Sequence, residues 1–139
     1  MTLGRLFHRI INHLDEGGRL VFDVFNPQVS LLANDPNERH ERARYPDPDG
    51  RGEVVVEETR EYLADRQLVR STRHYHVGGK REVFVGSLDL RCFFPCELDL
   101  ILEHFGFLIE AKYGDVDGGA IVGQSPKQVY VCSRLPVIE

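Results

Sequence analysis

A near-continuous apolar run is the feature of this sequence that most constrains its fold. Residues 19–25, Arg-Leu-Val-Phe-Asp-Val-Phe, follow Gly17-Gly18 and are rich in β-branched and aromatic side chains. Such a run predicts a strand covered on both faces, which is typical of the parallel sheets of α/β proteins. Asn26-Pro27 ends the strand, because proline cannot donate a hydrogen bond to a sheet ladder. The run therefore predicts an α/β protein.

Apolar residues recur at three- and four-residue steps in two segments, which predicts two amphipathic helices. The first helix precedes Gly17-Gly18, with Thr2 as a candidate N-cap, and its apolar stripe is Leu3, Phe7, Ile10, Ile11 and Leu14. The second begins at Pro95 and ends at Gly106, and its stripe is Leu98, Ile101, Leu102 and Phe105. Strands are predicted over 107–113 and 128–135, with a glycine- and aspartate-rich loop over 114–123 between them.

The middle of the chain has a different pattern. Strand-forming and polar residues are interleaved in three stretches of similar length: Glu53–Leu63, Gln67–Val77 and Lys80–Leu90. Asp65-Arg66 and Gly78-Gly79 separate these stretches as tight turns, and a two-glycine link is a good hairpin signal. Residues 53–90 are therefore predicted to form a three-stranded antiparallel meander with one face exposed to solvent.

The segment before this meander is charged and rich in proline. Pro27, Pro36, Pro46 and Pro48 lie in it or at its flank, and only residues 31–33 suggest a short helical turn. Residues 34–49 are therefore predicted to be a long, mobile surface loop.

Composition excludes several classes of protein. The 139 residues carry 17 Lys and Arg against 22 Asp and Glu, a net charge of -5, which argues against nucleic acid as the main partner because phosphate binding needs a basic face. No apolar run is long enough for a bilayer span, so no membrane contact is predicted. Three cysteines without disulfide-framework spacing suit a reducing compartment, and a cytoplasmic location is expected.

Three blocks of the sequence together resemble a known family. They are residues 13–27 (His-Leu-Asp-Glu-Gly-Gly followed by the apolar run and Asn-Pro), residues 91–98 with 104–107, and residues 113–118 with 125–128. In this order they resemble the C-terminal half of a class I S-adenosylmethionine-dependent methyltransferase of the small-molecule type. The resemblance covers essentially the whole chain.

The resemblance implies a particular architecture. A single domain over residues 1–139 would hold a partial Rossmann-like sheet with the equivalents of strands 5, 6 and 7. Residues 1–33 and 91–139 would form its α/β part, and residues 53–90 the inserted antiparallel meander.

The part of that family that binds the methyl donor has no counterpart here. The family holds S-adenosylmethionine with a glycine-rich turn after its first strand and an acidic residue at the end of its second. In this sequence Gly17-Gly18 ends a helix instead of opening one. The resemblance therefore implies a methyltransferase-like protein that binds no cofactor and is inactive as this chain alone. The alternative is a non-catalytic, homo-oligomeric module that binds a small molecule or a protein.

Five residues are predicted to lie on the side of the methyl acceptor: Asn26, Arg91, Tyr113, Asp115 and Asp117. In the family that the chain resembles, the end of strand five and the loop over 114–123 lie near the acceptor. Polar groups at the carboxyl ends of strands also face the crevice where α/β proteins bind ligands. For Arg91, an ion pair with a surface carboxylate is the favoured alternative. No catalytic residue is predicted, because methyl transfer depends mostly on holding donor and acceptor in line.

A partner is expected from the same resemblance. Strand four of the family pairs with strand five, so Leu20–Phe25 would present an unpaired apolar edge in this chain. Such an edge aggregates unless it is covered. A homodimer through this edge and its flanking apolar surface is therefore predicted.

Metal sites and nucleophiles are not predicted. His74 and His76 lie on one face of a predicted strand, but no third ligand is placed, and exposure to solvent on the meander is the favoured interpretation. Cys92, Cys96 and Cys132 lack the pairs of a zinc site and are interpreted as buried thiols. The loop with Asp115 and Asp117 lacks the terminal glutamate of a calcium loop.

Overall fold

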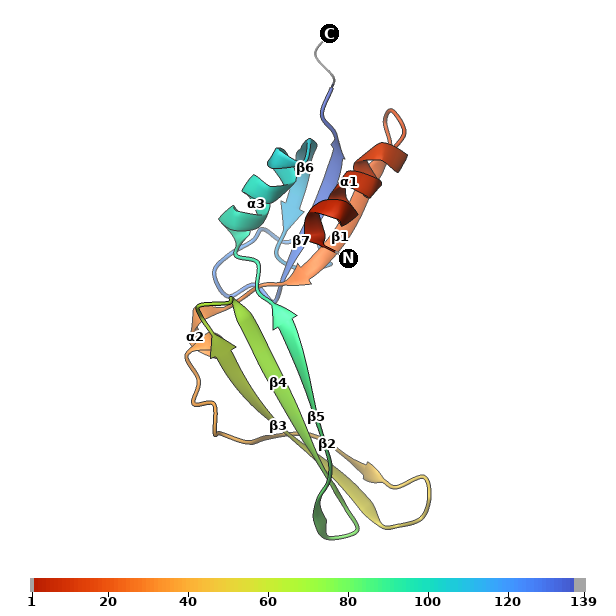
Figure 1. The fold of residues 1–139 in the computed structure, drawn as a ribbon, viewed down its shortest axis with the longest axis vertical. Helices are drawn as coiled ribbons and strands as arrows, with labels where there is room; N and C mark the ends of the chain where they lie inside the picture. Colours follow the sequence, from red (N-terminus) through yellow and green to blue (C-terminus); the bar gives the residue numbers. More distant parts are fainter. Residues whose placement is uncertain (1, 137–139) are drawn as a thin grey trace. The chain divides into compact units, whose positions relative to one another are not determined.

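A computed structural model describes residues 2–136 of the chain (Figure 1). Within that range the chain divides into two compact units. Residues 2–28 and 93–136 form unit 1, and Val29–Cys92 form unit 2. Unit 1 combines helices with a sheet, whereas unit 2 consists mainly of a second sheet.

Unit 1 is a three-stranded sheet with two longer helices on one face. Its elements are α1 (Leu3–His13), β1 (Arg19–Phe25), α3 (Pro95–His104), β6 (Phe107–Tyr113) and β7 (Lys127–Arg134). The strand order is β1-β7-β6, and β7 pairs antiparallel with both neighbours. Figure 1 shows α1 and α3 on the same side of the sheet, where their side chains share one core.

The core of unit 1 is rich in aromatic rings. Phe7 of α1 meets Phe107 of β6 edge-on, with the ring centroids 5.7 Å apart. Phe22 of β1 stacks on Tyr130 of β7 at 5.3 Å. Such pairs add to the gain from burying the ring area, so the aromatic contacts fix how the helices meet the sheet.

Local signals in the sequence place both helices correctly. The Thr2 hydroxyl accepts a hydrogen bond from the Arg5 amide at 3.4 Å, so the predicted N-cap of α1 is confirmed. Pro95 stands in the first turn of α3, and Glu97 accepts a hydrogen bond from the Phe94 amide at 3.3 Å. Gly106 follows α3 with φ +87°, a conformation that favours glycine.

The prediction that residues 19–25 form a strand is confirmed, but the prediction that both of its faces are covered is wrong for the described residues. β1 pairs antiparallel with β7, and its side chains alternate between half-buried and exposed. Leu20, Phe22 and Val24 contact the core, whereas Val21 is exposed on the opposite face. Residues 19–25 have apolar side chains on both faces of the strand, so the sequence alone predicts that both faces are covered. Among the described residues, helices pack on only one of these faces.

Unit 2 is a four-stranded antiparallel sheet with a short helix before it. Its elements are α2 (Val29–Leu32), β2 (His40–Pro46), β3 (Glu53–Leu63), β4 (Leu68–Val77) and β5 (Lys80–Arg91). The strand order is β2-β3-β4-β5. The three strands predicted over residues 53–90 are present as β3, β4 and β5, and Gly78 and Gly79 turn the chain with φ +56° and +79°.

The prediction of a mobile loop over residues 34–49 is wrong. The short helical turn expected at residues 31–33 overlaps α2, but the segment after it contains the fourth strand, β2, which pairs with β3. Ion pairs accompany the pairing, since Arg42 contacts Glu58 at 3.2 Å and Arg44 contacts Glu53. β2 was not predicted because strands are usually recognised by alternating apolar residues. The cross-strand contacts of β2 are instead ion pairs between charged side chains.

No helix within residues 2–136 is both long enough and apolar enough to cross a bilayer.

Replacing Leu102 by Ala tests the core of unit 1. Leu102 is 0% exposed, so Leu102→Ala is expected to lower the free energy of unfolding by about 2–5 kcal/mol, because it leaves a cavity. Leu100, on the same helix, is 67% exposed, and Leu100→Ala should change stability by no more than about 0.5 kcal/mol. Urea denaturation of both variants measures the difference, and equal losses would contradict the assigned packing of α3.

Candidate functional site

The carboxyl ends of β1 and β6 meet at one edge of the sheet of unit 1. Both strands are antiparallel to β7, so they run parallel to each other and end where β7 begins. Asn26 follows β1 directly, and Tyr113 is the last residue of β6. Residues 114–126 leave this edge and return to it at Lys127. Polar groups at such an edge are well placed for a ligand.

Asn26 holds the loop over 114–126 in place. The residue is buried, and its Nδ2 donates to the carbonyls of Ser125 at 2.9 Å and Gly123 at 3.3 Å. Its backbone amide donates to the Pro126 carbonyl at 3.0 Å. These bonds give both carbonyls a donor, and Ser125 is itself buried. Asn26 therefore acts through the loop that it positions.

Close packing also ties the start of this loop to its end. The Gly114 amide donates to the Gly119 carbonyl at 2.8 Å, and the Gly114 carbonyl accepts from the Lys127 amide at 3.1 Å. A Cβ atom at Gly114 would lie 2.3 Å from Ser125 Oγ, so only glycine fits there without a shift. The loop is thus a folded element of unit 1 and not a loose connection.

Carboxylates gather on the same edge. Asp115 accepts from the Val116 amide at 2.8 Å and Asp117 from the Gly119 amide at 2.9 Å, so each aspartate shapes its own turn. Lys127 Nζ donates to Asp23 Oδ2 at 2.6 Å. This hydrogen bond, together with the charges of Asp23 and Asp115, raises the pKa of Lys127. The carboxylates outnumber the lysine, which leaves the edge acidic.

The structure brings four of the five predicted site residues to this edge: Asn26, Tyr113, Asp115 and Asp117. Arg91 belongs to unit 2, where it ends β5 and its Nε donates to the Cys92 carbonyl at 3.1 Å.

A second polar cluster of unit 1 joins α3 to the sheet. Tyr130 Oη donates to Asp99 Oδ1 at 2.6 Å, and Lys112 Nζ donates to both oxygens of Asp99 at 2.7 and 2.9 Å. Gln128 Nε2 donates to the Phe93 carbonyl at 2.6 Å. Burial, the hydrogen bond to Asp99 and the charge of Asp99 raise the pKa of Tyr130 well above its usual value. Tyr130 is therefore a neutral donor and not a base.

Sequence reasoning missed this cluster. Lys112 and Tyr130 are cross-strand partners in the register of β6 and β7, and Asp99 lies on α3. The pairing of a lysine and a tyrosine in different segments follows only from the strand register. The one feature of the sequence that could have indicated this cluster is the presence of polar residues, alternating with apolar ones, in the predicted strands.

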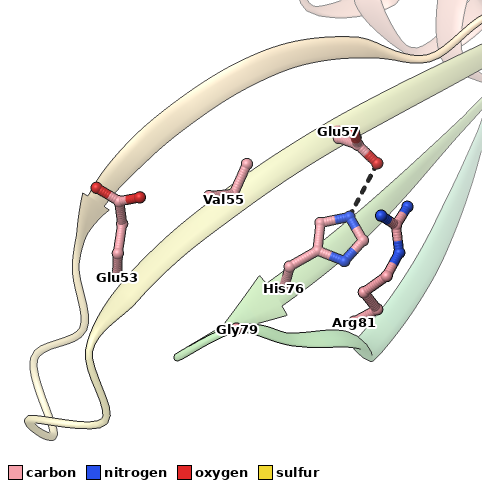
Figure 2. A pocket seen from close by; sticks show the side chains of 6 residues that line it. All are labelled: Glu53, Val55, Glu57, His76, Gly79 and Arg81. Carbon is pink, nitrogen blue, oxygen red and sulfur yellow. Dashed lines mark hydrogen bonds and ion pairs between the residues drawn. The ribbon is translucent and has the colours of Figure 1, made fainter.

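The sheet of unit 2 carries a shallow groove of about 290 Å³ (Figure 2). Its lining residues are Glu53, Val55, Glu57, His76, Gly79 and Arg81. Figure 2 shows the contact between His76 Nε2 and Glu57 Oε2, which measures 2.9 Å. His76 Nδ1 accepts from the Glu82 amide at 3.0 Å. Because both ring nitrogens are engaged, His76 is a structural link between β3, β4 and β5 and not a ready base.

The groups considered for metal binding do not form a site. His74 Nδ1 lies 3.1 Å from Glu82 Oε1 without the alignment of a hydrogen bond, and His76 is held as described above. No group of three or more His, Cys, Asp or Glu within residues 2–136 is arranged to hold a metal ion.

The cysteines do not form a reactive centre. Cys92 and Cys132 are buried and Cys96 is exposed, so the prediction of buried thiols is wrong for Cys96. Burial raises the pKa of Cys132 to about 11, which keeps this thiol protonated and unreactive at neutral pH. The described residues contain no disulfide.

The glycines do not form a turn for a nucleotide-type cofactor. The Gly-x-Gly of this sequence, Gly50-Arg51-Gly52, lies in the turn between β2 and β3 and leads into a strand. Gly17 and Gly18 lead into β1. A cofactor turn needs a helix N-terminus to follow it, where the backbone amides can face the ligand. No turn within residues 2–136 meets that requirement.

Comparison with known proteins identifies the fold. No family model and no curated protein matches the sequence. Among solved structures, an S-adenosylmethionine-dependent methyltransferase from Clostridium acetobutylicum ATCC 824 is 19% identical with a TM-score of 0.71, over 96% of this chain and 51% of that one. The methyltransferase CcbJ from Streptomyces caelestis is 18% identical with a TM-score of 0.72, over 96% and 50%. The sugar N-methyltransferase KedS8 from Streptoalloteichus sp ATCC 53650 is 20% identical with a TM-score of 0.61, over 96% and 49%.

These similarities define a methyltransferase-like α/β fold with antiparallel sheets. The chain spans about half the length of each of these proteins.

The role of Asn26 is tested by removing its amide. Asn26→Ala leaves the Gly123 and Ser125 carbonyls without their donor, so the free energy of unfolding should fall by about 1–3 kcal/mol. Amide exchange in residues 114–126 should accelerate at the same time. Asn12 is exposed on α1, and Asn12→Ala is the matched control that should change neither quantity. Unchanged exchange in the loop of Asn26→Ala would contradict the positioning role.

Proposed function

We propose that this chain supplies the C-terminal, acceptor-side half of an S-adenosylmethionine-dependent methyltransferase. The observation that carries this proposal is the coverage of the structural matches: 96% of this chain aligns with about half of each methyltransferase. In this proposal β1, β6 and β7 correspond to strands 5, 6 and 7 of the methyltransferase sheet. Unit 2 is the antiparallel insertion between strands 5 and 6.

The open edge of β1 supports the proposal. β1 pairs with β7 on one side and is the outermost strand of its sheet among the described residues. A sheet that continues beyond β1 would satisfy the remaining backbone groups of this strand. The exposed Val21, on the face opposite the helices, suits a surface that further elements cover.

Residues 2–136 do not themselves fit the methyl donor, because they hold no glycine-rich turn that opens a helix. The proposal therefore assigns donor binding to a different segment, either of the same polypeptide or of a separate chain. As this chain alone, the protein is then inactive. The residues described above would serve the acceptor only.

On the acceptor side, the proposal gives the edge residues different roles. Asn26 positions the loop over 114–126, and Asp115 and Asp117 supply the negative charge beside it. Carboxylates of this kind suit an acceptor with an amino group, in line with the sugar N-methyltransferase among the matches. Tyr113 and Arg91 remain acceptor-side candidates. The protein's part in methyl transfer is to hold the acceptor in line, which by itself accounts for much of the rate of such reactions.

Titration with S-adenosylmethionine tests the division of roles. Isothermal calorimetry of this chain alone should show no binding, because residues 2–136 contain no glycine turn that opens a helix and could face the donor. If codons upstream of Met1 encode a strand and a glycine-rich turn, the extended polypeptide should bind S-adenosylmethionine. Micromolar affinity of the 139-residue chain would overturn the proposal.

A second test addresses what covers β1 when this chain is alone. We propose that Leu20–Phe25 and the apolar surface beside it pair with a second copy, so sedimentation at micromolar concentration should give a dimer. Val21→Lys places a charge on the exposed face of β1 and should yield monomers. Val116→Lys, in an exposed turn, is the matched control and should leave the dimer intact. A wild-type monomer, or equal behaviour of the two variants, would contradict this interface.

The alternative is a non-catalytic homo-oligomer that binds a small molecule or a protein. Upstream codons that encode no strand and no glycine-rich turn would favour it, together with a dimer that persists under all conditions.

A further inference from the structure

One face of the sheet of unit 2 carries an unusual group of arginines, which we name the arginine cluster: Arg42, Arg60 and Arg73. All three surround one carboxylate, Glu58 of β3. Arg60 Nε lies 2.5 Å and Arg42 Nε 3.2 Å from Glu58 Oε1, and Arg73 Nε lies 3.5 Å from Oε2. Three guanidinium groups thus share one negative charge, which leaves two positive charges in excess.

Glu58 is charged and almost inaccessible. Its side chain is 3% exposed. Burial alone would raise the pKa of Glu58, but the charges and hydrogen bonds of Arg60, Ser71 and Arg42 together hold it below its usual value. The carboxylate is therefore fully committed to the cluster. It cannot be the group that neutralises further positive charge.

Among the described residues, three arginines share a single carboxylate only in this cluster. Glu58 is the one carboxylate within residues 2–136 that forms an ion pair with Arg42, Arg60 or Arg73. Other arginines of unit 2 have carboxylates of their own: Arg39 has Glu57 and Glu82, Arg44 has Glu41 and Glu53, Arg51 has Asp47 and Asp49, and Arg70 has Asp89. An anion supplied from outside would complete the cluster as these carboxylates complete the others.

Apolar side chains extend from the cluster to the edge of the sheet. Directly opposed residues of an antiparallel pair project from the same face, which places Phe84 and Leu88 of β5 on the face of Arg73. Phe84 is 61% and Leu88 59% exposed. Exposed apolar groups next to unbalanced charge mark a surface that binds a partner with both features.

The edge itself is suited to an extended partner. β5 is the outermost strand of the sheet, and each of its residues is exposed except Gly86, which is half-buried. Gly86 is the cross-strand partner of Arg73, and the ring of Phe84 lies over it, since a Cβ atom at Gly86 would be 3.0 Å from that ring. A strand added to β5 would lie about 10 Å from β4, within reach of an arginine and a glutamate side chain that extend toward each other.

We propose that β5 and the arginine cluster bind an extended acidic segment of another polypeptide. The segment adds to the free edge of β5 and sets a carboxylate opposite Gly86, where it meets Arg73. Apolar side chains at alternate positions of the segment contact Phe84 and Leu88. Backbone hydrogen bonds supply affinity and the alternating side chains supply specificity, as in other cases of strand addition.

A second copy of the chain does not fit this surface. On the face of Arg73, β5 presents Phe84, Gly86 and Leu88, and none of these carries a carboxylate. Pairing of two β5 strands would therefore leave both arginine clusters unbalanced. Stacking of two such faces would bring like charges together.

Synthetic peptides test the proposal with the full chain. In the first peptide every second residue is threonine, and the residues between the threonines are, in order, leucine, glutamate, glutamate and leucine. When the peptide is extended, its glutamates and leucines therefore lie on the same face. The second peptide has lysines in place of the glutamates. Fluorescence anisotropy should show binding of the acidic peptide, at least about tenfold weaker binding of the basic one, and weakening as salt rises. Hydrogen exchange should slow in β5 when the acidic peptide binds.

Variants on the two faces of β4 locate the contact. Arg73→Gln should weaken binding of the acidic peptide about tenfold. Arg70 lies on the opposite face of β4 with Asp89, and Arg70→Gln is the matched control that should leave binding unchanged. Arg73 is exposed enough that its loss should not unfold the sheet, which the denaturation curve of each variant checks.

Several outcomes would overturn the proposal. They are equal binding of the two peptides, equal effects of Arg73→Gln and Arg70→Gln, protection of residues outside β5, and an affinity that inorganic phosphate abolishes while chloride at the same ionic strength does not. The last result would assign the arginine cluster to a small free dianion. These tests do not involve S-adenosylmethionine, and the proposal on β5 stands or falls separately from the proposed function.

Discussion

The packing of β7 against both helices is the interaction on which unit 1 depends. β7 is hydrogen-bonded to β1 on one side and to β6 on the other, so it alone joins the two strands whose ends form the candidate site. Its inward side chains, Gln128, Tyr130 and Cys132, are completely buried. Tyr130 contacts Phe22 through its ring and Asp99 through its hydroxyl, which ties β1 and α3 to the same residue. The positions of the strand ends at the candidate site therefore depend on how β7 is packed.

Local features of the fold could be predicted from the sequence. The helices follow from apolar spacing, a cap at Thr2 and a glycine at the end of α3, and these signals act within a few residues of where they stand. The strands of unit 2 after residue 52 follow from their alternation and from Gly78-Gly79. In each case the physical cause lies in the segment itself.

Features that depend on distant residues could not be predicted. Whether the second face of β1 is covered depends on which elements pack on it, and the composition of Leu20–Phe25 is compatible with either state. β2 was missed because its ladder is reinforced by arginines and glutamates whose partners lie in β3. The link from Tyr130 to Asp99 requires the register of β7 against β6, which no short pattern encodes.

The candidate site shows the same division. The family resemblance, supported by the polar groups at the carboxyl ends of strands, predicted Asn26, Tyr113, Asp115 and Asp117 as site residues, and they lie at one edge of the sheet. What the sequence could not supply is the role of Asn26, whose amide faces the backbone of its own loop. Arg91 was predicted with these residues on the same resemblance, but it belongs to the other compact unit.

The order of the strands along the chain has a consequence for synthesis. Asp23 of β1 is aligned with Val129 of β7, so roughly a hundred residues must leave the ribosome before β1 meets its neighbour. The strands of unit 2 each pair with the next in sequence, and that sheet can form while the partner of β1 is still untranslated. During that interval β1 lacks the strand with which it pairs among the described residues, and its apolar side chains are at risk of aggregation.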